Sequence, residues 1–418
     1  MRMNKKKEIV PKLRFPEFGT SEGWKKYKLR ELADRITKKV GDNKLVTLSI
    51  SAGIGFVSQA EKFSRDISGK QYCNYIYLKK GEFSYNKGNS KTFPQGCIYE
   101  LKEYEEAAVP NAFISFRFKE NLVSSFYQGY FDSNFHGKQL VRFITSGARS
   151  DGLLNISPTD FFSIVLPTPV KKEEQQKIAD CLSSIDELID AESRKLKALE
   201  KYKKGLMQKL FPAEGKTLPE WRFPEFQECG EWKSKSIGKA CKMFSGGTPD
   251  TSRKEFYGGT IPFIRSAEIN KSSTELFITE EGFKNSSAKM VKKGDILIAL
   301  YGANSGEVAL SKIDGAINQA ILCLRHETNN VFVYHYFTHM KNWIISKYIQ
   351  GGQGNLSGQI IKSVNLYFPK AEEQQKIADF LSEIDTMITG QSNKVEQLKL
   401  HKKGLMQGLF PSLEEADV

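Results

Sequence analysis

Apolar residues follow an alternating four-three spacing in two long stretches of this chain. The first stretch carries them at Ile178, Leu182, Ile185, Ile189, Leu196, Leu199, Leu206 and Leu210. The second carries them at Ile377, Leu381, Ile384, Ile388, Val395, Leu398, Leu405 and Leu409. This spacing is typical of a helix whose apolar stripe packs on another helix. Each stretch therefore predicts a long helix that has a helical partner.

The two predicted helices share one sequence pattern. Glu-Glu-Gln-Gln-Lys-Ile-Ala-Asp occupies residues 173–180 and returns 199 positions later at residues 372–379. Lys-Lys-Gly-Leu-Met-Gln occupies residues 203–208 and returns at the same offset at residues 402–407. An internal repeat at a fixed offset predicts two related halves in one chain.

Polar residues interrupt both stripes at matching places, Glu192 and Lys203 in the first and Gln391 and Lys402 in the second. Parallel helices would set Lys203 against Lys402, whereas an antiparallel pair can set Glu192 against Lys402 and Lys203 against Gln391. A buried polar pair fixes the register of a coiled coil at a cost in stability. We therefore predict an antiparallel coiled coil in this register. The alternative is that each stripe packs only on its own half of the chain.

Each half also carries a short segment with proline and aromatic residues. Arg-Phe-Pro-Glu-Phe occurs at residues 14–18 and again at 222–226, and Trp24 and Trp232 follow. Proline restricts the backbone, and large aromatic side chains gain from burial. We expect each segment to be a hook that packs on a neighbouring element.

Runs rich in β-branched and aromatic residues predict strands between each hook and its long helix. They lie at residues 45–50, 75–78, 113–118 and 161–166 in the first half, and at 261–264, 296–300, 320–324 and 364–368 in the second. The expected fold is mixed α/β, with two similar domains separated by two long helices in a pseudo-two-fold arrangement. The expected boundaries are 1–170 and 213–369 for the domains, and 171–212 and 370–418 for the helices.

Composition indicates a basic protein without disulfides. Among 418 residues, 62 lysines and arginines exceed 49 acids, which gives a net charge of +13 and favours a polyanionic partner. The six cysteines lie far apart with no Cys-x-x-Cys, as in reduced cytoplasmic proteins. The basic start has no apolar core, and no run of eighteen apolar residues occurs, so neither a signal peptide nor a membrane span is expected.

Motifs for catalysis are missing from the sequence. The only fragment near a phosphate-binding loop, Gly238-Lys239-Ala240, lacks the upstream glycine and the hydroxyl, and Gly53-Ile54-Gly55 is more typical of a turn. No Asn/Asp-Pro-Pro-Tyr/Phe motif of adenine methyltransferases is present. His335 and His339 have the spacing of two metal ligands on a helix, but no third ligand is near in sequence. We therefore expect no catalytic residue, no metal and no cofactor.

At this point the whole chain resembles a known family, the specificity subunits of type I restriction-modification enzymes. The resemblance covers essentially all residues and rests on the repeated architecture with the Glu-Glu-Gln-Gln-Lys-Ile-Ala and Lys-Lys-Gly-Leu-Met-Gln blocks. It implies two target-recognition domains that each bind one half of a split duplex DNA sequence, and two helices that act as a ruler and dock two methyltransferase subunits. Those partners use S-adenosylmethionine to methylate adenine, and ATP-driven restriction subunits add cleavage. The specificity subunit itself is implied to be non-catalytic.

Polar, basic and glycine-rich loop segments are the candidates for DNA contact, because base edges and phosphates are bound by such groups. In the first domain the candidates are Asn86, Lys87, Asn89, Ser90, Lys91 and Arg149. In the second they are Gly247, Thr248, Arg253, Arg265, Tyr301, Asn304, Ser305, Gln353 and Asn355. Residues 301–305 occupy the place in the second domain that residues 85–91 occupy in the first. For each candidate a solvated turn is the alternative.

Repeated residues outside the apolar stripes are the candidates for partner binding, because a helix core does not require them. They are Gln175, Gln176, Lys204 and Met207 with their counterparts Gln374, Gln375, Lys403 and Met406. Recent duplication without divergence is the alternative.

Each repeat of about 38 residues would form a helix of roughly 57 Å, more than the roughly 34–36 Å of one DNA turn. A stand-alone DNA-binding regulator with two recognition domains remains the rival function, and a nicking or cleaving enzyme a second.

Overall fold

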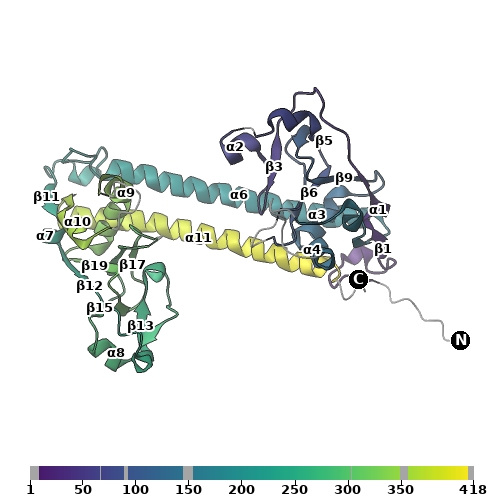
Figure 1. The fold of residues 1–418 in the computed structure, drawn as a ribbon. Coiled ribbons are helices and arrows are strands. Elements are labelled where there is room, and N and C mark those ends of the chain that lie inside the picture. Colours follow the sequence, from purple (N-terminus) through teal and green to yellow (C-terminus); the bar gives the residue numbers. More distant parts are fainter. Residues whose placement is uncertain are drawn as a thin grey trace. The chain divides into compact units, whose positions relative to one another are not determined.

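The structure, a computed structural model, describes residues 9–65, 67–88, 93–144, 154–302, 304–348 and 356–412. Contacts divide the chain into two compact units. Unit 1 comprises Met1–Glu192 with Lys394–Val418, and unit 2 comprises Ser193–Asn393. Two continuous helices of 39 residues each, α6 (Lys172–Leu210) and α11 (Ala371–Leu409), begin in one unit and end in the other (Figure 1). Both helices lie where the apolar spacing predicts them.

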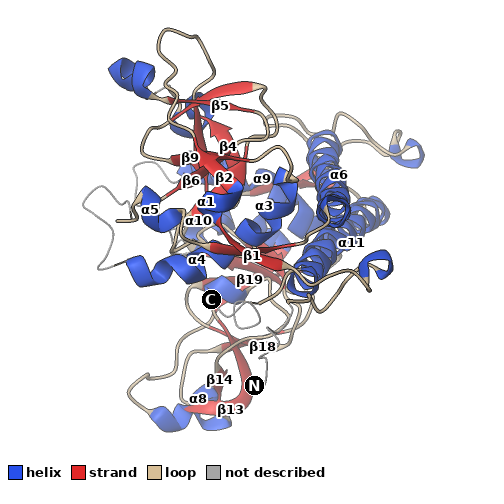
Figure 2. Ribbon diagram, turned by 90° about the vertical axis from the view of Figure 1, so that its right-hand side faces the viewer, coloured by secondary structure: helices blue, strands red, loops and turns tan. Residues whose placement is uncertain are grey.

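A four-stranded antiparallel sheet forms the centre of each unit. In unit 1 the strand order is β2 (Ala33–Arg35), β9 (Ile114–Phe118), β6 (Phe83–Asn86) and β7 (Cys97–Glu100). In unit 2 it is β12 (Cys241–Ser245), β19 (Ile321–His326), β16 (Ile296–Ala299) and β17 (Val308–Leu310). Figure 2 shows β2, β9 and β6 side by side. Because order and direction agree, the two units share one topology, as the sequence repeat predicts.

A two-stranded antiparallel pair closes each unit beside its long helix. Unit 1 pairs β1 (Lys25–Lys28) with β10 (Val165–Thr168), and unit 2 pairs β11 (Lys233–Ser236) with β20 (Asn365–Phe368). Short helices flank these strands: α1 (Leu29–Leu32) and α5 (Pro158–Phe161) in unit 1, and α7 (Ile237–Ala240) and α10 (Gly358–Ser363) in unit 2. The serine hydroxyls of Ser157 and Ser357 cap α5 and α10. The predicted strand at residues 161–166 is therefore wrong at its start, where the cap and Pro158 favour a helix instead.

The second layer of strands differs between the units. Unit 1 has the pairs β3 (Leu48–Ser51) with β4 (Gly55–Ser58) and β5 (Ile76–Lys79) with β8 (Glu106–Val109). Unit 2 has one sheet of β14 (Phe277–Ile278), β13 (Tyr257–Ile264), β18 (Gly315–Ile317) and β15 (Lys289–Val291). The other helices of the described residues are α2 (Gln59–Phe63), α3 (Ser124–Asp132), α4 (Phe135–Leu140), α8 (Glu280–Lys284) and α9 (Asn330–Tyr348). Short 3-10 turns complete this part of the chain: η1 (Pro16–Phe18), η2 (Gly69–Asn74), η3 (Val141–Phe143), η4 (Pro224–Phe226), η5 (Lys254–Phe256) and η6 (Ser266–Glu268).

The hooks are anchored on the long helices by buried ion pairs. Arg14 donates from Nε and Nη2 to the two oxygens of Glu174, each at 2.8 Å, and Arg222 does the same to Glu373 at 2.7 and 2.6 Å. Both glutamate side chains are 1% exposed. The expectation that each segment packs on a neighbour is confirmed, and the repeated Glu-Glu-Gln-Gln block supplies the acceptor.

Each hook also contacts the end of the other long helix in its unit. In unit 1 the backbone N–H of Leu13 donates to the carbonyl of Gly408 at 2.8 Å, and in unit 2 that of Trp221 donates to the carbonyl of Lys209 at 2.9 Å. These bonds satisfy carbonyls that the last turn of a helix leaves without an intrahelical donor. The hook therefore joins the beginning of one long helix to the end of the other.

The long helices form part of the main core of each unit. In unit 1 Ile178 and Leu182 of α6 and Met406 and Leu409 of α11 pack with aromatic residues of α3, and Phe410 lies 5.3 Å from Phe126 and 4.5 Å from Tyr130 between ring centres. In unit 2 the roles exchange, and Phe211 stacks on Tyr336 at 4.4 Å beside Met207 and Ile377. The repeated Leu-Phe-Pro sequence thus places the end of α6 in the core of unit 2 and the end of α11 in the core of unit 1.

The helices run antiparallel within each unit, as predicted, but the predicted register is wrong. In unit 1 Lys402 pairs with Asp186, with Nζ 2.7 Å from Oδ1, and Glu192 pairs with Lys394. In unit 2 Lys203 pairs with Asp385 rather than facing Gln391. The long lysine stem lets the ammonium reach an aspartate beside the stripe, so the polar stripe residues need not face one another. Asp186 and Asp385 are themselves 199 positions apart, so one lysine–aspartate pair is made twice.

Candidate nucleic-acid interface

The turn after β6 holds the first predicted DNA-contact residues. Asn86 is partly occupied by its own loop, because its Oδ1 accepts the N–H of Gly88 at 2.9 Å and its Nδ2 donates to the carbonyl of Ile50 at 3.4 Å. Lys87 is half-buried, and its carbonyl accepts the N–H of Leu154 at 2.9 Å. Asn86 therefore shapes the loop from which Lys87 extends.

The corresponding turn in unit 2 follows β16. Tyr301 is 41% exposed, and Gly302 has a φ of +80°, which favours glycine. Ser305 donates from its hydroxyl to the carbonyl of Leu300 at 2.9 Å, and the carbonyl of Asn304 accepts the N–H of Glu307 at 2.9 Å. The turn is built by its polar residues, and the Tyr301 ring is the large group that it leaves open to a ligand.

The Gly246-Gly247 segment has a structural role. A β-carbon on Gly246 would lie 1.7 Å from the carbonyl oxygen of Ile317, and one on Gly247 would lie 2.6 Å from Cβ of Ser287. Gly247 is also buried, and the two glycines let the segment after β12 lie close to Ile317 and Ser287, which makes Gly247 a weaker candidate for DNA contact than the sequence suggests. Thr248 is exposed, and its hydroxyl donates to Oε1 of Gln319 at 2.7 Å.

Two predicted DNA-contact arginines are paired with carboxylates. Arg253 donates from Nε to Glu255 at 2.8 Å. Arg265 binds both Glu268, at 3.0 Å, and Glu275, at 2.6 Å, and this arginine lowers the pKa of Glu268 to about 2. A phosphate would have to compete with these carboxylates, which makes both arginines weaker candidates than the sequence suggests.

The other predicted contacts, Asn89, Ser90, Lys91, Arg149, Gln353 and Asn355, lie outside the described residues.

A basic hollow in unit 2 was missed by the sequence reasoning. Its cavity of about 510 Å³ is lined by Lys242 of β12, Lys362 and Gln359 of α10, and Ser357, with no carboxylate in the lining. Lysines and an amide next to an open hollow suit a phosphate backbone. The sequence alone could not have shown this hollow, since β12 and α10, whose side chains line it, are more than 100 residues apart in sequence.

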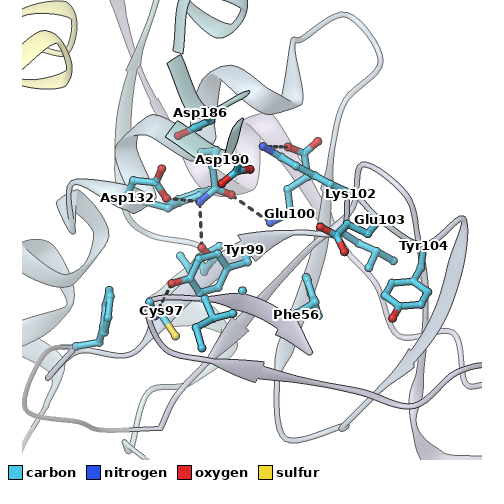
Figure 3. A pocket seen from close by; sticks show the side chains of 18 of the residues that line it. Phe56, Cys97, Tyr99, Glu100, Lys102, Glu103, Tyr104, Asp132, Asp186 and Asp190 are labelled. Atoms are coloured by element: carbon cyan, nitrogen blue, oxygen red, sulfur yellow. Dashed lines mark hydrogen bonds and ion pairs between the residues drawn. The ribbon is translucent and has the colours of Figure 1, made fainter. Parts of the chain in front are cut away.

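A cavity of unit 1 has the opposite character. It also measures about 510 Å³, and its lining includes Glu100, Glu103, Asp132, Asp186 and Asp190 against Lys102 and Lys402. Figure 3 shows Asp132, Asp186 and Asp190 gathered on one side of it. Burial raises the pKa of the Glu100 carboxyl. Excess carboxylates repel phosphate, so this cavity is a weaker candidate for DNA contact than the loops of unit 1.

The predicted partner-binding residues divide into two groups. Gln175, Gln374, Met207 and Met406 are 2%, 5%, 5% and 8% exposed. Their side chains are buried within the folded units, which makes these four weaker candidates for partner binding than the sequence suggests. The side-chain amides of Gln175 and Gln374 donate to the carbonyls of Pro169 and Pro369. Gln176, Gln375, Lys204 and Lys403 are exposed on the long helices and stay candidates.

The two histidines of α9 differ in burial, since His335 is buried and His339 is half-buried. His335 is 1% exposed with its Nδ1 3.9 Å from Asp385 Oδ2, and burial lowers its pKa to about 3. Among the described residues no cluster of three or more histidine, cysteine, aspartate or glutamate side chains could hold a metal ion. Within the same residues no helix combines the length and the apolar character needed to cross a bilayer.

Comparison with known proteins supplies the family. The family model described as "Type I restriction modification DNA specificity domain" matches this chain twice, at residues 21–201 and 230–399. The chain belongs to this family. It is similar to two proteins of Methanocaldococcus jannaschii: the MjaX specificity subunit of a type I restriction enzyme, 28% identical over 70% of this chain and 68% of the relative, and the MjaIX specificity subunit, 31% identical over 44% and 45%.

Solved structures of the family show the same fold. The type I restriction-modification system S subunit from M. genitalium superposes with a TM-score of 0.63 at 16% identity, covering 97% of this chain and 100% of that one. A structure on complex assembly and conformational transition of the type I system gives a TM-score of 0.55 at 16% identity, over 93% and 98%. These two likenesses show that this chain has the fold of those structures over nearly its whole length.

Proposed function

We propose that this chain is the DNA-recognition subunit of a type I restriction-modification complex, and that each unit reads one half of a bipartite target in duplex DNA. The observation that carries the proposal is the duplication itself: each unit repeats the same four-stranded sheet, hook and long-helix anchor, and each matches the specificity-domain model separately. The two units share the four-stranded sheet and differ in their second layer of strands and in their loops, as expected for two domains that bind different half-sites.

The chain acts in this proposal by binding, not by catalysis. Two histidines whose pKa burial lowers, His335 and His136, are closed off inside the units at 1% exposure each. Two methyltransferase subunits supply the methyl transfer, and restriction subunits join the full complex in the cytoplasm. Membership of the specificity family and the net charge of +13 support this assignment.

The test is a methylation assay with the full chain. The purified chain is mixed with a type I methyltransferase subunit from the same genome, S-adenosylmethionine and plasmid DNA, and N6-methyladenine is mapped. The proposal predicts a split motif that is methylated only when this chain is present. A stand-alone regulator would instead bind its site tightly and leave methylation unchanged, which would contradict the proposal.

A further inference from the structure

The cavity of unit 1 that Figure 3 shows is acidic, although the chain as a whole is basic. The chain has a net charge of +13, yet five carboxylates line this cavity against two lysines, Lys102 and Lys402. Lys402 is already paired with Asp132 and Asp186, at 3.3 and 2.7 Å from its Nζ. The Lys102 side chain is 54% exposed, and its Nζ stays 4.0 Å from Glu100. The two lysines therefore do not neutralise the cavity.

Three carboxylates of the cavity lack a close cation. Glu103 and Asp190 are exposed, and among the described residues neither side chain forms an ion pair or a hydrogen bond. The Glu100 side chain is only 8% exposed, and its Oε2 accepts no hydrogen bond from the part of the chain that the structure describes. A buried carboxylate oxygen without a donor is unfavourable, so a bound cation would stabilise this group.

The carboxylates lie in two places with aromatic rings between elements of the wall. Figure 3 shows Glu103 apart from Asp186 and Asp190, which lie on the other side of the cavity. Tyr99 and Tyr104 are among the aromatic residues of the lining. Aromatic faces attract ammonium groups and also pack against methylene groups. The cavity thus combines two anionic ends with an aromatic wall.

Unit 2 does not repeat these carboxylates. Glu100 is the last residue of β7 and lies opposite the first residue of β6, whereas the same place in unit 2, at the end of β17 opposite the first residue of β16, holds Leu310. The counterpart of Asp190 in the long-helix repeat, 199 positions later, is Thr389. The shared frame of the two units therefore does not require the acidic groups, which belong to unit 1 alone.

We propose that this cavity of unit 1 binds a linear polyamine, an aliphatic chain that carries two or more ammonium groups. One ammonium group lies beside Asp186 and Asp190 and another beside Glu100 and Glu103, and the methylene chain between them packs on the aromatic wall. A metal ion does not fit, because among the described residues no three histidine, cysteine, aspartate or glutamate side chains are placed to hold one. The proposal does not rest on the proposed function, since it concerns the chain alone.

Calorimetric titration of the full chain, freed of nucleic acid, with spermidine tests the proposal. We expect saturable binding of one spermidine per chain. The melting temperature should rise with spermidine concentration, because a ligand that binds only the folded state stabilises it. Propylamine has a single ammonium group and, at the same ionic strength, should bind at least about tenfold more weakly. Spermidine binding that does not saturate, or propylamine binding of equal strength, would overturn the proposal.

Variants of the two exposed carboxylates place the ligand in the cavity. Glu103→Gln and Asp190→Asn should each weaken spermidine binding about threefold, and the double variant about tenfold. Glu187→Gln is the matched control, because it removes the same charge from an exposed position of α6 outside the lining. Without ligand all four variants should melt as the wild type does, since the Glu103 and Asp190 side chains have no partner among the described residues. A double variant that binds spermidine as tightly as Glu187→Gln does would show that the cavity is not the site.

Discussion

The two units hold their hooks with the same arginine–glutamate pair but surround it differently. In unit 1 the Trp24 indole also donates to Glu174, at 3.0 Å. In unit 2 the indole N–H of Trp232 is buried and has no acceptor in the part of the chain that the structure describes, so Glu373 depends on Arg222. The long-helix repeat thus supplies the buried glutamate in both units, whereas the number of side chains that donate to this glutamate differs between the units. Loss of the arginine should therefore lower the free energy of unfolding more in unit 2 than in unit 1.

The largest effect should come from removing that arginine. Arg222→Ala leaves a 1% exposed carboxylate without a cation, which costs about 3–5 kcal/mol of unfolding free energy. Arg14→Ala should cost less, because Trp24 still donates to Glu174. Denaturant unfolding of the two variants measures both values. Equal losses would show that the tryptophan contact does not distinguish the units.

The next comparison concerns the lysines between the long helices. Lys402 binds Asp186 and also Asp132 of α3, whereas Lys203 binds Asp385 beside the uncharged His335. Lys402→Met leaves two partly exposed carboxylates close together and should lower the unfolding free energy by about 2–3 kcal/mol. Lys203→Met leaves one and should cost about half as much. A larger loss for Lys203→Met would contradict this account of the two sites.

His335 should make unit 2 sensitive to acid. Burial lowers its pKa to about 3, from an ordinary value of 6.5, so the unfolded chain binds a proton that the folded chain does not. Stability from this group is complete above pH 6.5 and falls as the pH is lowered toward 3, by about 2 kcal/mol between pH 7 and pH 5. His335→Gln should remove the share of this loss that His335 contributes, while His136, whose pKa burial lowers to about 4, keeps its own share. An unaltered profile in His335→Gln would show that the histidine is not the titrating group.

The smallest effects should come from the tryptophans. Trp24→Phe removes a hydrogen bond to a buried carboxylate and should cost about 1–2 kcal/mol, apart from the loss of ring size common to both variants. Trp232→Phe removes an N–H that has no acceptor, so its polar contribution should be about zero or slightly stabilising. The difference between the two variants in thermal unfolding isolates the hydrogen bond.

The frame of this fold is predictable from the sequence because it depends on periodic burial and an exact repeat. The four-three stripes give α6 and α11, and the duplicated hooks give the anchors on Glu174 and Glu373. The register is not predictable in this way, because flexible lysine stems let Lys402 and Lys203 reach Asp186 and Asp385 instead of the residues opposite them.

The candidate site is less predictable, since composition does not show which polar groups the fold already uses. Arg265 pairs with two glutamates, and Gly247 is buried against Ser287, although both residues looked suited to DNA. Conversely, Lys242 and Lys362 meet at one hollow only after β12 and α10 fold together. Met207 and Met406 each lie in a core at a helix end, so burial alone is enough to explain their repetition.

The most direct test of the two-reader account is a map of N6-methyladenine made with the wild-type chain and with one loop variant in each unit, Lys87→Ala and Tyr301→Ala. The account predicts that each variant alters base preference or efficiency at one half of the split motif and leaves the other half unchanged. A contiguous motif, or two variants that both alter the same half, would contradict it.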